Sequence, residues 1–135
     1  MFAAMHNPMA AYKKVEIETG VESADPHKLI LMLFEGALLA VASASLHMQR
    51  KESPADVARK GEAISKAINI IENGLKASLD MSAGPDLAAK LAALYDYMVS
   101  RLLYANIHNQ PAILDEISHL LAELKGAWEQ IGRKA

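Results

Sequence analysis

The chain has 135 residues and no cysteine, so we expect one domain of ordinary size without disulfides, thiolate metal sites or a cysteine nucleophile. Its formal net charge of −2 provides no positive field for nucleic acid or anionic lipid, and neither is expected as a partner. The composition is 52% hydrophobic but only 5% aromatic, and it is rich in alanine and leucine, which favours helices over strands.

Residues 1–24 differ from the rest of the chain, because their apolar side chains show no lasting periodicity. Tyr12, Val15 and Ile17 are apolar anchors in this stretch, and Gly20 follows them. The segment lacks a basic start followed by an apolar run, so no secretory signal is predicted and a cytosolic location is expected. The sequence predicts a flexible N-terminal arm over residues 1–24 and a helical domain over residues 25–135.

Four prolines divide the remainder into stretches of similar length, and each proline precedes a long helical pattern. Proline suits the first position of a helix, where its missing N–H would have no partner anyway. Short connections between helices of similar length make neighbouring helices antiparallel. The pattern therefore predicts an all-α, antiparallel up-down four-helix bundle, with helices over residues 26–51, 54–80, 85–109 and 111–131 that begin at Pro26, Pro54, Pro85 and Pro111.

The first and third helices carry more apolar residues than one buried stripe requires. Residues 29–34 are six consecutive apolar residues, and at about 100° per residue they surround the helix axis. On the third helix Tyr95 and Tyr97 point in different directions, as do Leu102, Leu103 and Tyr104. Some of these side chains cannot face the core, and the surplus predicts a surface that binds a partner chain. The alternative is that the arm or a second copy of the chain covers this surface.

Two further features of these helices lead to expectations. Glu35 interrupts the apolar stretch of the first helix, and the following helices are amphipathic, so no membrane insertion is expected. Gly61 lies on the predicted core stripe, which suggests close approach of a neighbouring helix, and Gly36 is a place where a helix or a partner backbone could approach.

Patterns for catalysis or metal binding are weak. Glu116 and His119 match the Glu-x-x-His motif of di-iron bundle proteins, but that site needs the motif twice and two further glutamates. No zinc spacing, nucleophile elbow or phosphate-binding glycine loop is found. We therefore expect a non-enzymatic protein with no metal and no cofactor, and a ferritin-like oxidase is the enzymatic alternative.

Strings in all four predicted helices resemble those of a known family. The first helix contains ADPHKLI (residues 24–30) and MLFEGA (residues 32–37), and the second contains KAINIIENGL (residues 66–75). The third contains LYDYM (residues 94–98) followed by RLL (101–103) and AN (105–106), and Trp128 lies near the end of the fourth. Over residues 10–131 the chain resembles the flagellar secretion chaperones of the FliS type.

The resemblance implies a cytosolic export chaperone that binds the disordered C-terminal segment of flagellin, prevents premature polymerisation and keeps the subunit competent for the flagellar type III export apparatus. It also implies that the arm residues Tyr12, Val15 and Ile17 form a lid over the client site. The grooves for the client are expected to be lined by Leu33, Phe34, Ile68, Ile71, Leu94, Tyr95, Met98, Leu102 and Asn106, with core packing as the alternative for each apolar residue. The competing hypothesis is a helical adaptor for another partner, or a homodimer that buries the same surface.

Overall fold

The computed structural model describes residues 25–50, 53–80 and 84–134 of the chain. Within this part the chain forms four long helices and no strand, which confirms the predicted all-α bundle. The helices are α3 (Pro26–Arg50), α4 (Pro54–Ile70) continued by the π-helix η1 (Ile71–Lys76), α5 (Pro85–His108) and α6 (Pro111–Lys134).

Each of these helices begins at the proline that predicted it. At the start of α4 the Ser53 hydroxyl accepts a hydrogen bond from the backbone N–H of Asp56 at 3.2 Å, which satisfies one of the free donors of the first turn. At the start of α3 an Asp25 carboxylate oxygen accepts from the His27 N–H at 3.0 Å. Proline and a short polar residue before it therefore define where these helices start.

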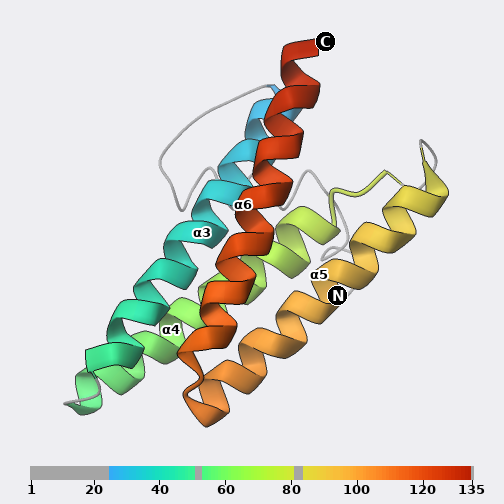
Figure 1. Ribbon diagram of the computed structural model, residues 1–135. Helices are drawn as coiled ribbons and strands as arrows, with labels where there is room; N and C mark the ends of the chain where they lie inside the picture. Colours follow the sequence, from blue (N-terminus) through green and yellow to red (C-terminus); the bar gives the residue numbers. More distant parts are fainter. Residues whose placement is uncertain (1–24, 51–52, 81–83, 135) are drawn as a thin grey trace.

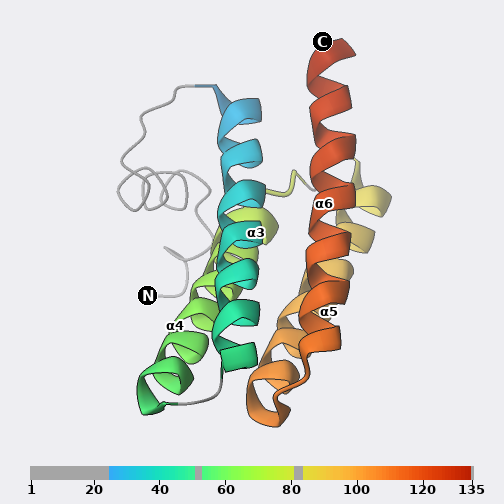
Figure 2. The same cartoon turned by 60° about the vertical axis from the view of Figure 1, so that its left-hand side comes forward.

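The helices alternate in direction along the bundle (Figures 1 and 2). α3 lies against both α4 and α6, and α5 lies against α6, α4 and η1. α3 is long and apolar enough to cross a membrane by those two criteria alone, which the core helix of a soluble protein also meets. Its place between two helices fits a core helix.

The interior of the bundle is one cluster to which every helix contributes. Burying a large aliphatic side chain contributes roughly 1.5–3 kcal/mol relative to leaving it in water. The largest fully buried side chains are Leu33, Val41 and Met48 of α3, Ile64 of α4, Ile71 and Leu75 of η1, Met98 and Leu102 of α5, and Leu114, Ile117 and Leu121 of α6.

The second predicted helix differs from expectation in its last third, where η1 replaces regular α-helix. A β-carbon added at Gly74 would lie 2.7 Å from Cδ2 of Leu33, so a larger residue at this close approach of η1 to α3 would have to displace that buried side chain. The Asn73 side-chain amide donates to the Asn69 side-chain oxygen at 2.8 Å along the same segment. Ile70 at the end of α4 and Ile71 at the start of η1 are both buried.

The close approach expected at Gly61 is wrong, because a β-carbon added there would meet no atom within 4 Å. Gly61 lies one residue after Lys60, whose ammonium group reaches the end of α5. It donates to the backbone oxygen of Asn106 at 3.0 Å and to the side-chain oxygen of Asn109 at 2.7 Å. The start of α4 and the end of α5 are thus joined here by a polar contact in which Gly61 takes no part.

Candidate functional site

Six of the nine side chains expected to line client grooves lie in the interior of the bundle. They are Leu33, Phe34, Ile71, Tyr95, Met98 and Leu102, with exposed fractions of 0–4%. Ile68, Leu94 and Asn106 are partly exposed. In the chain alone the six stabilise the core and do not face solvent, and the client role of all nine stays a prediction.

Tyr95 shows how complete this burial is. Loss of solvent around its hydroxyl raises the pKa of Tyr95 to about 12, so the phenol is neutral at physiological pH. Two residues further along α5, Tyr97 is exposed and donates a hydrogen bond to a carboxylate oxygen of Glu116 at 2.6 Å. The prediction that these two tyrosines face different environments is confirmed.

Tyr12, Val15 and Ile17 lie outside the described residues, so their proposed role as a lid also stays a prediction.

A groove of about 370 Å³ lies on the surface between α3 and α4, and we call it the α3–α4 groove. Gly36 and Ala40 of α3 and Ala63 of α4 line it together with the larger side chains of Met32, Leu33 and Ile70. A β-carbon at Gly36 would lie 3.3 Å from Cδ1 of Ile70, so the Ile70 side chain packs closely against α3 at this point. Three of the lining residues are small, which favours close approach of a partner helix at these positions.

The two rims of the α3–α4 groove differ in chemistry. On the α3 side Leu39 lines the groove with 72% of its surface exposed, which is costly for so apolar a side chain. On the α4 side the lining residues Arg59, Glu62 and Lys66 are exposed. Their side chains form no ion pair with any other described residue. Leu39 is thus the exposed apolar residue of the α3 rim, which also carries Ser43 and His47, and the α4 rim is charged.

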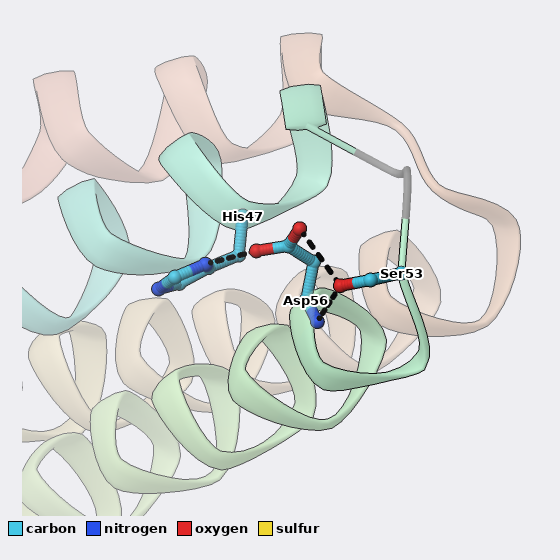
Figure 3. A network of polar contacts seen from close by, with 3 residues as sticks. All are labelled: His47, Ser53 and Asp56. Atoms are coloured by element: carbon cyan, nitrogen blue, oxygen red, sulfur yellow. Dashed lines mark hydrogen bonds and ion pairs between the residues drawn. The ribbon is translucent and has the colours of Figure 1, made fainter.

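One end of the groove is formed by His47, which belongs to a polar network at the α3–α4 connection (Figure 3). His47 Nδ1 donates to one carboxylate oxygen of Asp56 at 2.9 Å, and the Ser53 hydroxyl donates to the other at 3.2 Å. The hydrogen bond from His47 is the main cause that holds the pKa of Asp56 below its usual value, with a smaller contribution from Ser53. The carboxylate therefore stays ionised and fixes both His47 and the first turn of α4.

Sequence reasoning did not single out this network. Ser53 and Asp56 have the three-residue spacing of a capping box, and this spacing is the local sequence signal for the Ser53–Asp56 part of the network. His47 belongs to the preceding helix, and no local pattern indicates that it reaches Asp56.

A second depression of about 360 Å³ lies on the other side of α3, between α3 and α6. Leu46 is exposed along it, and Leu114 of α6 forms part of its buried wall. Further along the surface, α5 exposes Leu103, Tyr104 and Ile107, of which Ile107 is 73% exposed. The prediction that the first and third helices keep surplus apolar surface is confirmed.

The Glu-x-x-His motif on α6 is engaged in contacts that need no metal. Glu116 receives the hydrogen bond from Tyr97 and lies 3.6 Å from Nε of Arg101. His119 pairs with Glu123 at 3.0 Å on an exposed face. Across the residues that the structure describes, no three histidine, aspartate or glutamate side chains are grouped closely enough to hold a metal ion.

Comparison with known proteins agrees with this architecture. A family model described as "Flagellar protein FliS" matches residues 8–135. The flagellar secretion chaperone FliS of Salmonella typhimurium (strain LT2) is 50% identical over 125 residues, which cover 93% of this chain and 90% of the relative. FliSB of Pseudomonas aeruginosa (strain PAO1) is 44% identical over 123 residues, 91% of this chain and 94% of the relative. FliS of Bacillus subtilis (strain 168) is 33% identical over 127 residues, 94% of this chain and 87% of the relative.

These matches extend over nearly the whole chain and include the helices that form the α3–α4 groove. The chain therefore belongs to the FliS family of flagellar secretion chaperones, whose members are named as chaperones and not as enzymes.

Proposed function

We propose that this protein is a cytosolic chaperone for flagellin, which binds the disordered C-terminal segment of the subunit before export. By covering that segment it prevents premature polymerisation and keeps the subunit competent for the flagellar type III export apparatus, whose components are its further partners. Membership of the FliS family supports a chaperone for flagellar secretion. The α3–α4 groove, with the small lining residues Gly36, Ala40 and Ala63 and the exposed Leu39, is the observation that carries the choice of a helical client.

A disordered segment loses conformational entropy when it is ordered on a chaperone, and this cost has to be offset by burial of roughly 1,000–3,000 Å² of surface. One groove is too small for that, but the described surface offers more. The depression between α3 and α6 lies on the opposite side of α3, and the exposed residues of α5 lie on a third helix. A segment that passes around the bundle would use several of these surfaces in turn, as helices laid with their apolar faces inward.

The decisive experiment is calorimetric titration of the purified chain with flagellin and with flagellin that lacks its C-terminal segment. We expect binding to the intact subunit and none to the truncated one, and an isolated peptide of the segment should bind and gain helicity on binding. Binding that is unaffected by the truncation would overturn the proposal.

The exposed apolar residues of α5 favour a second candidate function, a helical adaptor or a homodimer that buries this face. Light scattering across a range of concentrations tests the homodimer. A stable dimer whose affinity for flagellin does not depend on the C-terminal segment would favour this alternative.

A further inference from the structure

The α4 rim of the α3–α4 groove carries charges in a fixed order, positive at Arg59, negative at Glu62 and positive at Lys66. All three side chains are exposed, line the same groove and lack an ion-pair partner among the described residues. Arg59 and Lys66 are seven residues apart, which is about 10.5 Å along a helix. A helix that lies alongside α4 presents its own residues at the same rise, so side chains with i, i+3 or i+4, and i+7 spacing would face the three rim residues in turn.

We propose that Arg59, Glu62 and Lys66 determine which amphipathic helix the groove accepts. On the flank of the client helix that faces α4, an acidic residue pairs with Arg59, a neutral or basic residue lies opposite Glu62, and a second acidic residue pairs with Lys66. This inference rests on the proposed function and specifies the chemistry of the client at this groove. The apolar face of the client helix lies on Gly36, Ala40 and Ala63, and its charged flank faces α4. The opposite flank faces Leu39 and is apolar.

The rim acts on selectivity more than on total affinity. An exposed ion pair contributes little by itself, whereas a like charge placed opposite Arg59 or Lys66 is repelled and disfavours the wrong helix. Because the outer two charges are positive and the middle one negative, a helix shifted by one turn places an acidic residue opposite Glu62. The charge order therefore also fixes the position of the client along the groove.

The test uses two synthetic helical peptides with the same apolar face and opposite flanks, one with glutamate, lysine and glutamate at i, i+3 and i+7, and the other with lysine, glutamate and lysine. Binding to the full chain is measured by fluorescence anisotropy of a labelled peptide at low salt. We expect the glutamate-flanked peptide to bind about threefold to tenfold more tightly. The preference should shrink as salt approaches about 0.5 M, because these pairs are exposed to solvent.

The double variant Arg59→Glu with Lys66→Glu should reverse the preference. A matched control is Lys90→Glu with Lys125→Glu, which makes the same change in net charge on α5 and α6, outside the groove. The control should keep the wild-type preference. If the rim variant keeps it too, or if both variants lose it equally, the inference is wrong. Circular dichroism confirms that each variant is folded. The double variant Arg59→Gln with Lys66→Gln is a second test, because it should abolish the peptide preference without reversing it.

Other occupants of the groove give different results. If the rim variant changes the mass of the free chain by light scattering and not its peptide preference, the groove holds a second copy. If it changes only hydrogen exchange within residues 1–24, the groove holds the arm. Either result overturns the inference. Flagellin titrations separate this inference from the proposed function. If the peptide preference fails but intact flagellin still binds through its C-terminal segment, the inference is wrong and the proposed function stands.

Discussion

Leu39 and Leu87 are two leucines with similar exposure but different surroundings. Leu39 is 72% exposed on the rim of the α3–α4 groove, and Leu87 is 65% exposed near the start of α5, outside both depressions. Leu39→Gln should weaken binding of the flagellin segment about fivefold to thirtyfold, because about 1–2 kcal/mol of apolar burial would be lost. Leu87→Gln should have a smaller effect on affinity. Both should change the free energy of unfolding by less than about 0.5 kcal/mol, since neither residue is in the core.

Calorimetric titration of both variants with the segment, beside urea unfolding, measures these effects. Equal losses of affinity would show that the α3–α4 groove has no special part in client binding, and a large loss of stability in Leu39→Gln would show that the side chain supports the fold.

The Asp56 carboxylate makes stability depend on pH at the acid end. Its pKa is lower in the folded chain than its usual value, first of all because of the hydrogen bond from His47. Such a group stabilises the folded state above its unfolded pKa of about 4, and this contribution is lost as the pH falls through the lower folded value. We expect wild type to be more stable than Asp56→Asn at about pH 6, with a difference that shrinks as the pH falls toward about 2. Urea unfolding at a series of pH values measures this difference, and a gap that stays constant would mean that Asp56 acts without its charge.

At the scale of the helices, the contact between α4 and α5 depends on Lys60, a lysine with only 7% exposure. Its ammonium group donates to Asn106 and Asn109 at the end of α5, where a positive charge also interacts favourably with the helix dipole. Asn109 has a φ of 50°, a left-handed conformation that asparagine tolerates better than most residues and that ends α5 before Pro111. Lys60→Met should lower the free energy of unfolding by about 1–3 kcal/mol, because it leaves these acceptors without their donor.

The matched control is Lys66→Met, an exposed lysine of the same helix, which should change stability by no more than about 0.5 kcal/mol. Hydrogen exchange should rise in the last turn of α5 in the Lys60 variant alone. If the two variants unfold at the same urea concentration, Lys60 does not stabilise the junction.

The helices themselves were predictable because their signals are local. Proline at the first position and the run of strong helix formers that follows it lie within a few residues of each other, and all four starts were predicted from them. Which apolar residues of α3 and α5 face inward was not predictable, because apolar side chains occur on every side of these helices and only the neighbouring helices decide. Phe34 and Tyr95 are examples: they were expected in a client groove, and the structure places them in the interior.

The sequence did not predict the α3–α4 groove or the contacts that support it, for a related reason. His47 reaches Asp56 across a connection, and Lys60 reaches the end of α5, which is far away in the sequence. The η1 segment breaks the regular period from which the second stripe was predicted. Each of these features depends on how separate helices meet, and a periodic pattern within one helix contains no information about that.

At the scale of the whole molecule, the first and last described helices are joined at one end of the bundle. The rings of His27 on α3 and Trp128 on α6 stack with centroids 4.9 Å apart and an interplanar angle of 11°. The Trp128 indole N–H donates to the His27 backbone oxygen at 3.0 Å, and His27 Nε2 donates to the Trp128 backbone oxygen at 2.7 Å. The space for the imidazole exists only because residue 132 is glycine, since a β-carbon there would overlap the ring. This contact holds α3, the helix between the two depressions, against α6.

Gly132→Ala should therefore displace His27 and lower the free energy of unfolding by about 1–3 kcal/mol, even though alanine favours a helix. Gly126→Ala is the matched control on the same helix, where an added β-carbon meets no atom within 4 Å, and it should raise stability by about 0.5–1 kcal/mol. Trp128 is the single tryptophan of the chain, so its fluorescence reports this end of the bundle directly. We expect its emission to shift to longer wavelength in Gly132→Ala and to stay unchanged in Gly126→Ala. If both glycine variants are equally stable and emit alike, the stacked pair does not hold α3 to α6, and the position of α3 must depend on the apolar core alone.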